Sequence, residues 1–258
     1  MSQNKLSKLA ASVIYVKEEN HLMEVDDQVE LFVKAGDDGE SYGGCPKSQQ
    51  IFMVLLIKAE QSSLNVRVTT VNVNKQRAHF GRLPALVHKD QVITDPDEML
   101  DYIDRNWELP DLDIEQTRAR HVTLEIFSKF SFFIKQVSHG PDKMIAELYR
   151  LNEYLLENEH KYLCSDNLSH LDCLVLPKLQ HIRVASKAFK SFEIPDKMKG
   201  VWCYLRAAYD NTIFRQTCPS DQQIIAHWAS KPELPPLQDN VKLHYACMPP
   251  KYSFDVPL

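Results

Sequence analysis

The side chain best placed for chemistry is Cys45, in the stretch Gly-Gly-Cys-Pro-Lys-Ser. Apolar residues follow as far as Ile57. Because proline is tolerated in the first turn of a helix, the stretch predicts a helix that begins at Pro46. The free amide groups and the dipole of a helix start favour an anion, and hence the thiolate of Cys45. The two glycines allow a ligand to approach the backbone closely. The stretch therefore suggests thiol chemistry.

Ser48 stands where a dithiol site would carry its second cysteine. A C-x-x-S site cannot close its own disulfide, but it can form a mixed disulfide with a small thiol, which a second small thiol resolves. Glutathione suits that role as a co-substrate. The alternative is that Cys45 only fills space at a helix start, since acidic residues in the preceding loop oppose a thiolate. The stretch Cys218-Pro219-Ser220 shows how easily so short a motif recurs.

Two further stretches could bind the small thiol. A cis bond between Leu83 and Pro84 would turn the backbone N–H and C=O of Leu83 outward, toward a peptide-like ligand. The alternative is an ordinary trans proline at the start of a strand. Asp95 lies between a predicted strand and a predicted helix, where it can receive a charged amino group. The alternative is that Asp95 or Thr94 simply caps the helix, and for Asp95 the two roles are compatible.

The elements around these residues follow a β-α-β order, then a hairpin, then a helix. Alternating β-rich residues predict the strands, and the hairpin is centred on the turn at Lys89-Asp90. This is the order of a thioredoxin-like domain. The predicted strands and helices are Val29–Gly36, Pro46–Glu60, Leu64–Val73 and Pro96–Arg105.

Helical spacing replaces strand signals after Asp111. We expect helices over Glu115–Val137 and Lys143–Asn158, a long buried helix after Ser169, and two more from near Pro195 and Pro219. Ser169 and Asp172 form a variant of the capping box. The sequence thus predicts an arm over residues 1–27, a thioredoxin-like domain over 28–108, an all-helical domain over 111–230 and a proline-rich tail over 231–258. We expect the arm to be amphipathic or disordered, and the tail to be mostly disordered or pinned to the surface.

The composition of the whole chain excludes several classes of protein. A net charge of −5 argues against nucleic acid as a main partner. Six cysteines with no C-x-x-C pair give no zinc or dithiol motif and favour a reducing compartment. Nowhere do the roughly 18 apolar residues of a transmembrane helix run together. Extending Ile51–Ile57 to that length takes in charges, each costing about 2.5–3.5 kcal/mol at mid-bilayer. We therefore expect a soluble protein of the cytoplasm.

Seven stretches occur in an order that resembles one family. They are ELFVKAG, CPKSQQIFMVLLIK, VTTVNV, LPALV, DCLVLPKLQHIRV, FEIP and TCPSDQQII. Together they resemble the chloride intracellular channel proteins, which are relatives of omega-class glutathione transferases. The resemblance covers roughly Val29 to Trp228 and is strongest toward invertebrate members.

The resemblance implies an α/β plus all-α architecture of the glutathione-transferase type, glutathione-dependent thiol oxidoreductase chemistry, and reversible membrane association with anion conductance. Cys45, Pro46 and Ser48 match the family's redox motif. Leu83, Pro84 and Asp95 match its glutathione-contacting positions. The family's membrane segment maps onto Pro46 to Val68 and includes Lys58. We expect a mostly monomeric soluble form, with glutathione, membrane lipid and cytoskeletal or scaffold proteins as partners.

Departures from the family pattern affect the membrane role most. Lys47 replaces a phenylalanine and adds a cation that favours the thiolate, whereas Gln50 replaces an arginine of the pore segment. No cysteine precedes Gly-Arg-Leu-Pro, so an internal disulfide described in the family cannot form in the same way, and Pro96 removes a backbone donor. Three functions therefore stay open: a thiol oxidoreductase, a membrane-inserting anion channel, and a non-catalytic scaffold that keeps the fold for partner binding.

Overall fold

The computed structural model describes residues 27–73, 75, 80–114, 116–234, 236, 237, 239, 245 and 248–257, and the backbone alone of residues 12–15. The chain divides into two compact units, Met1–Asp111 and Leu112–Leu258. The division falls next to residue 111, where the sequence predicted the start of the all-helical domain.

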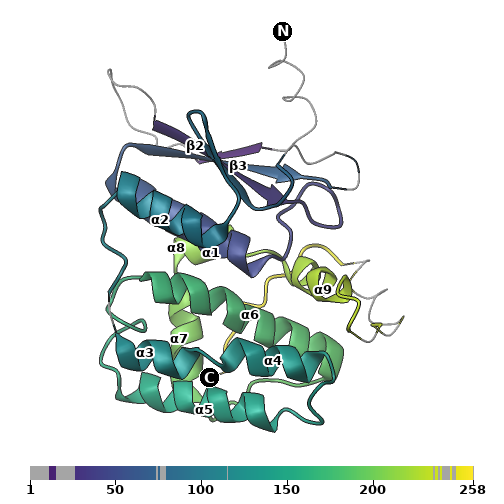
Figure 1. The fold of residues 1–258 in the computed structure, drawn as a ribbon. Helices are drawn as coiled ribbons and strands as arrows, with labels where there is room; N and C mark the ends of the chain where they lie inside the picture. The colour runs from purple at the N-terminus through teal and green to yellow at the C-terminus, as the bar shows by residue number, and fades with distance from the viewer. Residues whose placement is uncertain are drawn as a thin grey trace. The chain divides into compact units, whose positions relative to one another are not determined.

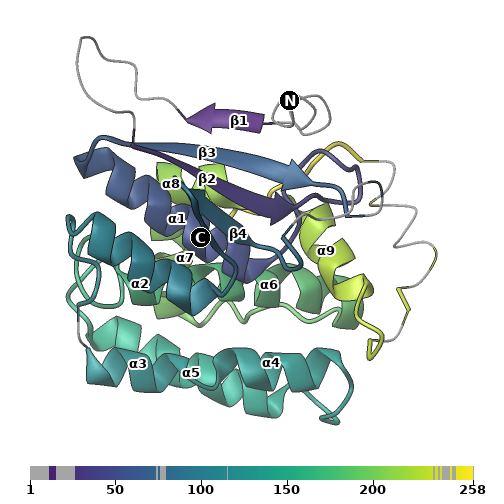
Figure 2. The same ribbon diagram turned by 45° about the horizontal axis from the view of Figure 1, so that its top comes forward.

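The N-terminal unit is built on a mixed sheet with the strand order β1-β3-β2-β4-β5 (Figure 2). The strands are β1 (Ser12–Tyr15), β2 (Asp27–Lys34), β3 (Leu64–Val71), β4 (Ala85–His88) and β5 (Gln91–Ile93). β2 and β3 run parallel with Val29 opposite Val66, and the other neighbours are antiparallel. Buried and exposed positions alternate along β2, as its period-two pattern predicts.

Two helices cover one face of this sheet. α1 (Pro46–Gln61) connects the parallel strands β2 and β3, and α2 (Pro96–Asn106) packs beside it (Figure 1). α1 is buried at every residue from Ser48 to Lys58, which accounts for its nearly continuous apolar sequence. The predicted thioredoxin-like order of elements is confirmed. Because α1 follows β2 in this order, the chain passes from the carboxyl end of β2 through a loop to the first turn of α1.

β1 was not predicted from the sequence. Residues 1–27 were expected to form an amphipathic or disordered arm, but Ser12–Tyr15 pairs antiparallel with β3, with Ser12 opposite Thr69. The four residues are too few for a reliable alternating pattern, and the strand exists because the edge of β3 offers free backbone partners. Residues 1–11 and 16–26 lie outside the described part of the chain.

The C-terminal unit is helical in the residues described. Its helices are α3 (Thr117–Thr123), α4 (Ile126–Ile134), α5 (Asp142–Glu157), α6 (His170–Lys190), α7 (Lys199–Tyr209), α8 (Thr212–Thr217) and α9 (Asp221–Ala229). α5 packs against α3, α4 and α7, while α6 packs against α4, α7 and α9 (Figure 1). Their apolar stripes meet in a core that includes Phe130, Leu148, Leu151, Leu176 and Leu179.

Two helical predictions were wrong in detail. The single helix expected over Glu115–Val137 is broken into α3 and α4. The Thr123 hydroxyl donates to the carbonyls of Ala119 and Arg120, an arrangement that bends helices and competes with their continuation. The second miss is α8, a short helix that Asn211 caps by accepting a hydrogen bond from the Phe214 amide.

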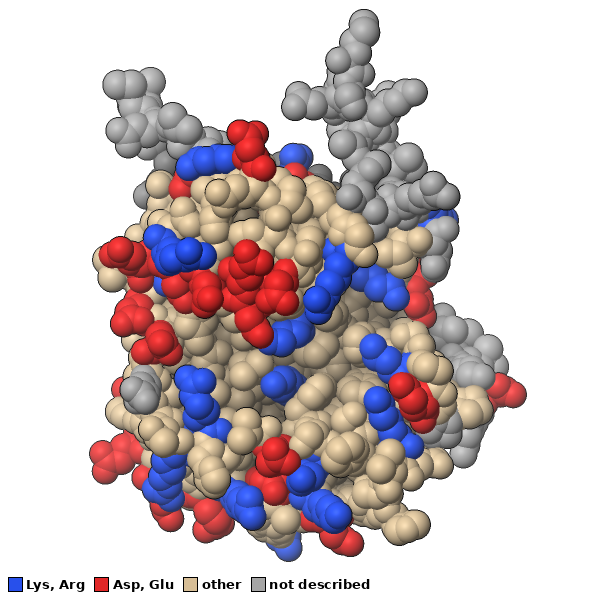
Figure 3. Space-filling view, in the orientation of Figure 1, with Lys and Arg blue, Asp and Glu red and all other residues tan. Residues whose placement is uncertain are grey.

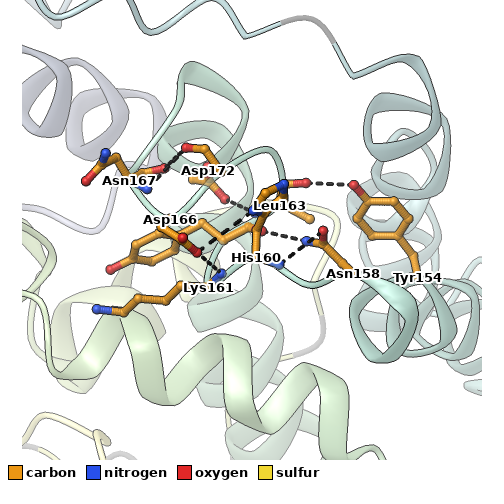
Figure 4. Close-up of polar contacts among 10 residues, drawn as sticks. Tyr154, Asn158, His160, Lys161, Leu163, Asp166, Asn167 and Asp172 are labelled. Carbon is orange, nitrogen blue, oxygen red and sulfur yellow. Dashed lines mark hydrogen bonds and ion pairs between the residues drawn. The ribbon is translucent and has the colours of Figure 1, made fainter.

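The predicted capping box at the start of α6 is confirmed. Its Asp172 also fixes the preceding loop, through the contact with Leu163 drawn in Figure 4. The buried carboxylate of Asp172 accepts hydrogen bonds from Ser169, from the Leu163 amide at 2.9 Å and from the Tyr204 hydroxyl at 2.8 Å. Burial raises the pKa of Asp172, although these hydrogen bonds oppose the rise. From the other side, the Tyr154 hydroxyl donates to the Leu163 carbonyl at 2.6 Å. This loop is therefore a structural feature of the helical unit.

Candidate functional site

Cys45 is the residue that caps the N-terminus of α1. Its backbone is extended (φ −94°, ψ 113°), Pro46 follows as the first helical residue, and the half-buried side chain is a free thiol. Its carbonyl accepts the first helical hydrogen bond, from the Gln49 amide at 3.1 Å. Because the first amides of a helix have no partners within it, the thiol lies beside donors that can stabilise a thiolate or an anionic ligand.

Gly43 holds the thiol loop against the end of β2. Its N–H donates to the Lys34 carbonyl at 2.9 Å. A Cβ at this position would lie 2.7 Å from that carbonyl oxygen and 3.1 Å from the carbonyl oxygen of Ala35. The close approach that the sequence predicted for a ligand is made here by the protein's own backbone. Glycine is required at residue 43 in order to position Cys45.

The peptide bond between Leu83 and Pro84 is cis. Pro84 directly precedes β4, and Ala85 at the start of that strand pairs with Phe32 near the end of β2. The loop that carries Cys45 is hydrogen-bonded to that same end of β2. The sheet therefore brings the cis-proline loop and the thiol loop to one edge, which the sequence alone could suggest only by analogy.

Asp95 caps α2, as its alternative interpretation predicted. One carboxylate oxygen accepts hydrogen bonds from the amides of Asp97 at 3.0 Å and Glu98 at 3.1 Å. The hydrogen bond from the Glu98 amide is the main reason why the pKa of Asp95 lies below its ordinary value, and the charges of Arg82 and Lys47 add to it. Its second oxygen lies 3.9 Å from the Arg82 guanidinium, and the side chain is 53% exposed. It remains accessible to a cationic group of a ligand.

Lys47 and Arg82 connect the site in a way that sequence reasoning missed. The Lys47 ammonium lies 3.1 Å from the Asp97 carboxylate, so an ion pair joins the first turn of α1 to the first turn of α2. Arg82 extends the contact from the cis-proline loop to Asp95. Acidic side chains gather over α2 on the face drawn in Figure 3. The two cations therefore offset a locally negative surface beside the thiol. The basic residue just before Leu83-Pro84 was the available sequence signal.

This arrangement suits a ligand that carries a thiol, a peptide backbone and charged ends. Helix starts and cations attract carboxylates, an exposed carboxylate attracts an ammonium group, and the backbone beside a cis proline can pair with a peptide. Ser48 is buried in the first turn of α1, next to the thiol in sequence. No cluster of three metal-ligating side chains exists among the described residues. The roles of these residues in glutathione binding stay predictions.

The other cysteines that the structure describes are less suited to exchange. Cys164, Cys173 and Cys218 are buried, and burial raises the pKa of the first two thiols. Cys203 is exposed on the middle of α7. Cys218, which shares the Cys-Pro pair, directly follows α8, and α9 begins only at Asp221. Cys218 therefore lies two residues further from a helix start than Cys45 does.

The segment from Pro46 to Val68 is α1 together with the first part of β3. Its lysine, Lys58, is only 1% exposed, and its ammonium lies 2.8 Å from Asp104. It also donates to the carbonyls of Pro110 at 2.9 Å and Glu108 at 3.3 Å. In the part of the chain that the structure describes, no helix combines the length and the apolar character needed to cross a bilayer.

Comparison with known proteins establishes the family. A sequence model of the CLIC-like N-terminal domain matches residues 27–110. The chloride intracellular channel exl-1 of Caenorhabditis elegans is 34% identical over 236 residues, which cover 88% of this chain and 98% of that protein. The chain belongs to the chloride intracellular channel (CLIC) family. The resemblance noted from the sequence is thereby confirmed.

Solved structures agree on the fold. The crystal structure of the CLIC homologue EXC-4 from C. elegans matches with a TM-score of 0.80 at 23% identity, over 90% of this chain and 95% of that chain. A dehydroascorbate reductase from Chlamydomonas reinhardtii matches with a TM-score of 0.69 at 19% identity, over 79% of this chain and 98% of that chain. This CLIC protein thus has the glutathione-transferase-like fold, a thioredoxin-like unit followed by an all-helical unit.

Proposed function

We propose that this CLIC protein catalyses glutathione-dependent thiol–disulfide exchange through Cys45. The observation that carries the proposal is the position of the Cys45 thiol at the start of α1, at the sheet edge where the cis Leu83-Pro84 bond also lies. The likeness of its fold to that of a dehydroascorbate reductase supports glutathione as the co-substrate.

The exchange proceeds in two balanced steps. The Cys45 thiolate attacks the glutathione sulfur of a substrate mixed disulfide, a new S–S bond joins Cys45 to glutathione, and the substrate sulfur leaves with the electron pair and takes a proton from water. A second glutathione thiolate then attacks the glutathione sulfur on Cys45. Oxidised glutathione leaves and the Cys45 thiolate is restored. In net terms the substrate mixed disulfide and one glutathione thiol become a substrate thiol and one molecule of oxidised glutathione.

The neighbouring residues position glutathione in this scheme. The Leu83 backbone pairs with the ligand's peptide groups, and Asp95 receives its ammonium group. Pro46 leaves the first turn of α1 with one donor fewer, while Ser48 lies in that turn and replaces a resolving cysteine. Without that cysteine, the mixed disulfide with glutathione persists until a second glutathione arrives.

The test is glutathione-dependent reduction of hydroxyethyl disulfide, with mass spectrometry of the protein after treatment with oxidised glutathione. We expect the adduct on Cys45 and loss of turnover in Cys45→Ala. Cys218→Ala is the matched control, since it removes a thiol from the second Cys-Pro pair and should leave turnover unchanged. Full turnover in Cys45→Ala, or an adduct mainly on Cys218, would contradict the proposal.

We also propose a cytoplasmic form that associates conditionally with membranes, in which Pro46 to Val68 leaves the fold and contacts lipid. The name of its relative exl-1 as a chloride intracellular channel favours chloride conductance by that form. Acid should promote the change, because protonation of carboxylates lowers the negative charge that repels anionic lipid. Peroxide should act weakly, since no partner cysteine precedes Leu83.

Vesicle flotation at pH 7 and pH 5, with and without peroxide, tests the membrane proposal, and chloride efflux from loaded vesicles tests conductance. Strong peroxide-driven binding at neutral pH without an acid effect would refute it. If neither exchange nor membrane binding occurs, the remaining function is a scaffold that binds cytoskeletal or signalling proteins. In that case the wild type and Cys45→Ala should bind the same partner proteins equally well.

A further inference from the structure

The segment 249–255 lies extended along the helical unit, and its backbone is hydrogen-bonded at alternate residues. The Pro249 carbonyl accepts from the Gln222 side-chain amide at 2.8 Å. The Lys251 N–H donates to the side-chain oxygen Oε1 of Gln222 at 3.0 Å, and the Lys251 carbonyl accepts from the Asp221 backbone N–H at 2.8 Å. A period of two is the spacing with which proteins recognise an extended peptide.

Ser253 is recognised at all three of its polar groups. Its N–H donates to one Asp221 carboxylate oxygen at 3.1 Å, and its hydroxyl donates to the other at 2.6 Å. Its carbonyl accepts from Arg183 at 2.7 Å and from Gln180 at 3.3 Å. Two residues further on, the Asp255 carboxylate pairs with the same Arg183 guanidinium at 3.1 Å. These contacts specify a hydroxyl and an acid at fixed spacing.

Phe254 supplies an apolar anchor between these two polar positions. Its ring centroid lies 5.1 Å from that of Tyr209 and 6.2 Å from that of Phe214, and the Arg215 guanidinium lies 5.2 Å from the Phe254 centroid. The ring of Tyr252 lies 5.7 Å away along the segment. Aromatic and cation–π contacts of this kind supply much of the energy of peptide recognition.

Two of the polar side chains that hold the segment are buried in the helical unit: Asp221 is only 4% exposed and Gln180 is fully buried. Burial raises the pKa of Asp221, and the hydrogen bonds from the Ser253 hydroxyl and amide oppose the rise. A buried carboxylate without those donors would be unfavourable. The helical unit therefore holds a site whose buried polar groups need hydrogen-bond partners from an extended segment.

We propose that this site is a peptide-recognition groove for an extended segment of a partner protein, and that the chain's own tail occupies it until the partner competes. The partner segment carries a hydroxyl residue, an aromatic residue and an acid in the order Ser-Phe-Asp. A tail on the same chain acts at an effective concentration on the order of millimolar, which keeps the groove closed to weak ligands. The groove consists of Gln180, Arg183, Tyr209, Phe214, Asp221 and Gln222.

The test uses a fluorescent peptide with the sequence of residues 248–257 and the full-length chain, with fluorescence anisotropy as the readout. We expect weak binding to the wild type, and binding at least about tenfold tighter to Phe254→Ala, whose own tail has lost its anchor. A peptide with alanine in place of its phenylalanine should bind neither chain. Circular dichroism and thermal melting establish that each variant is folded.

Asp255→Lys serves as a second variant, because that side chain is 84% exposed and its change turns the pair with Arg183 into a repulsion without affecting the core. It should also bind the peptide more tightly than the wild type does. Equal binding to all three chains, or no binding to a folded tail variant, would overturn the proposal. So would a wild-type dimer, seen by light scattering, that Phe254→Ala converts to monomer, because the groove would then serve tail exchange between copies.

Discussion

Replacing Lys58 by methionine and Asp104 by asparagine would separate the folding role of this ion pair from its effect on membrane entry. Both substitutions remove the ion pair formed by this 2.8 Å contact. Lys58→Met also removes the buried charge, whereas Asp104→Asn leaves the ammonium with the carbonyls of Glu108 and Pro110. The two variants therefore lose one interaction in common and differ in whether α1 still carries a charge.

The expected magnitudes follow from burial. Removing one partner of a fully buried pair costs about 3–5 kcal/mol because the other charge is left uncompensated. Asp104 is 37% exposed, so water screens the pair and we expect about 2 kcal/mol for Asp104→Asn. Lys58→Met should cost about 1 kcal/mol, since an apolar side chain of similar volume avoids the buried charge. In lipid Lys58→Met is again the less costly change, because a lysine at mid-bilayer costs about 2.5–3.5 kcal/mol and methionine does not.

Urea unfolding followed by circular dichroism measures the first effect, and flotation with anionic vesicles at pH 7 measures the second. We expect Asp104→Asn to be the less stable variant and Lys58→Met to bind vesicles more strongly. Equal or stronger vesicle binding by Asp104→Asn would show that unfolding, and not the charge of Lys58, limits membrane entry. A larger loss of stability in Lys58→Met would refute the argument from the uncompensated charge.

Three further predictions address the thiol loop, the ligand and the helical unit. Gly43→Ala should lower the free energy of unfolding by about 1–3 kcal/mol and slow glutathionylation, because its Cβ would lie 2.7 Å from the Lys34 carbonyl oxygen, whereas Gly140→Ala meets nothing closer than 3.5 Å and should be tolerated in the same urea titration. Asp95→Asn should keep the α2 cap but weaken glutathione binding in calorimetry, and unchanged affinity would leave Asp95 with a capping role alone. Burial lowers the pKa of His181, so His181 binds a proton in the unfolded chain before it does in the folded one as the pH falls below about 6.5. The free energy of unfolding should therefore fall by at most about 1.4 kcal/mol per pH unit, and His181→Gln should flatten this dependence in urea titrations at pH 7 and pH 5.

Local sequence signals predicted the elements around the site well. The alternation in β2 and β3, the proline at the start of α1 and the capping box at Ser169 each act within a few residues, so the sequence displays them directly. β1 and the break at Thr123 depend on partners or on side-chain hydrogen bonds that no pattern displays. The errors therefore fall where backbone conformation is decided by tertiary contacts.

In the candidate site, too, some features could be predicted from the sequence and others depend on tertiary contacts. Cys45, Leu83-Pro84 and Asp95 could be selected because each residue type has a known use beside a helix start or a strand. The ion pair between Lys47 and Asp97 joins residues fifty positions apart, and it follows only from the packing of α1 beside α2. The sequence could name the residues that do the chemistry, but not the charges that surround them.

α1 links the two proposed activities because they use it in incompatible ways. Exchange at Cys45 requires an intact first turn held against β2 through Gly43, whereas membrane entry requires the same helix to leave the sheet and Lys58 to leave Asp104. A protein molecule can therefore be in only one of the two states at a time. Any ligand that binds the folded site stabilises it in proportion to ligand concentration and affinity, and so opposes membrane entry by mass action. On this reasoning, glutathione would regulate the membrane form without any contact in the bilayer.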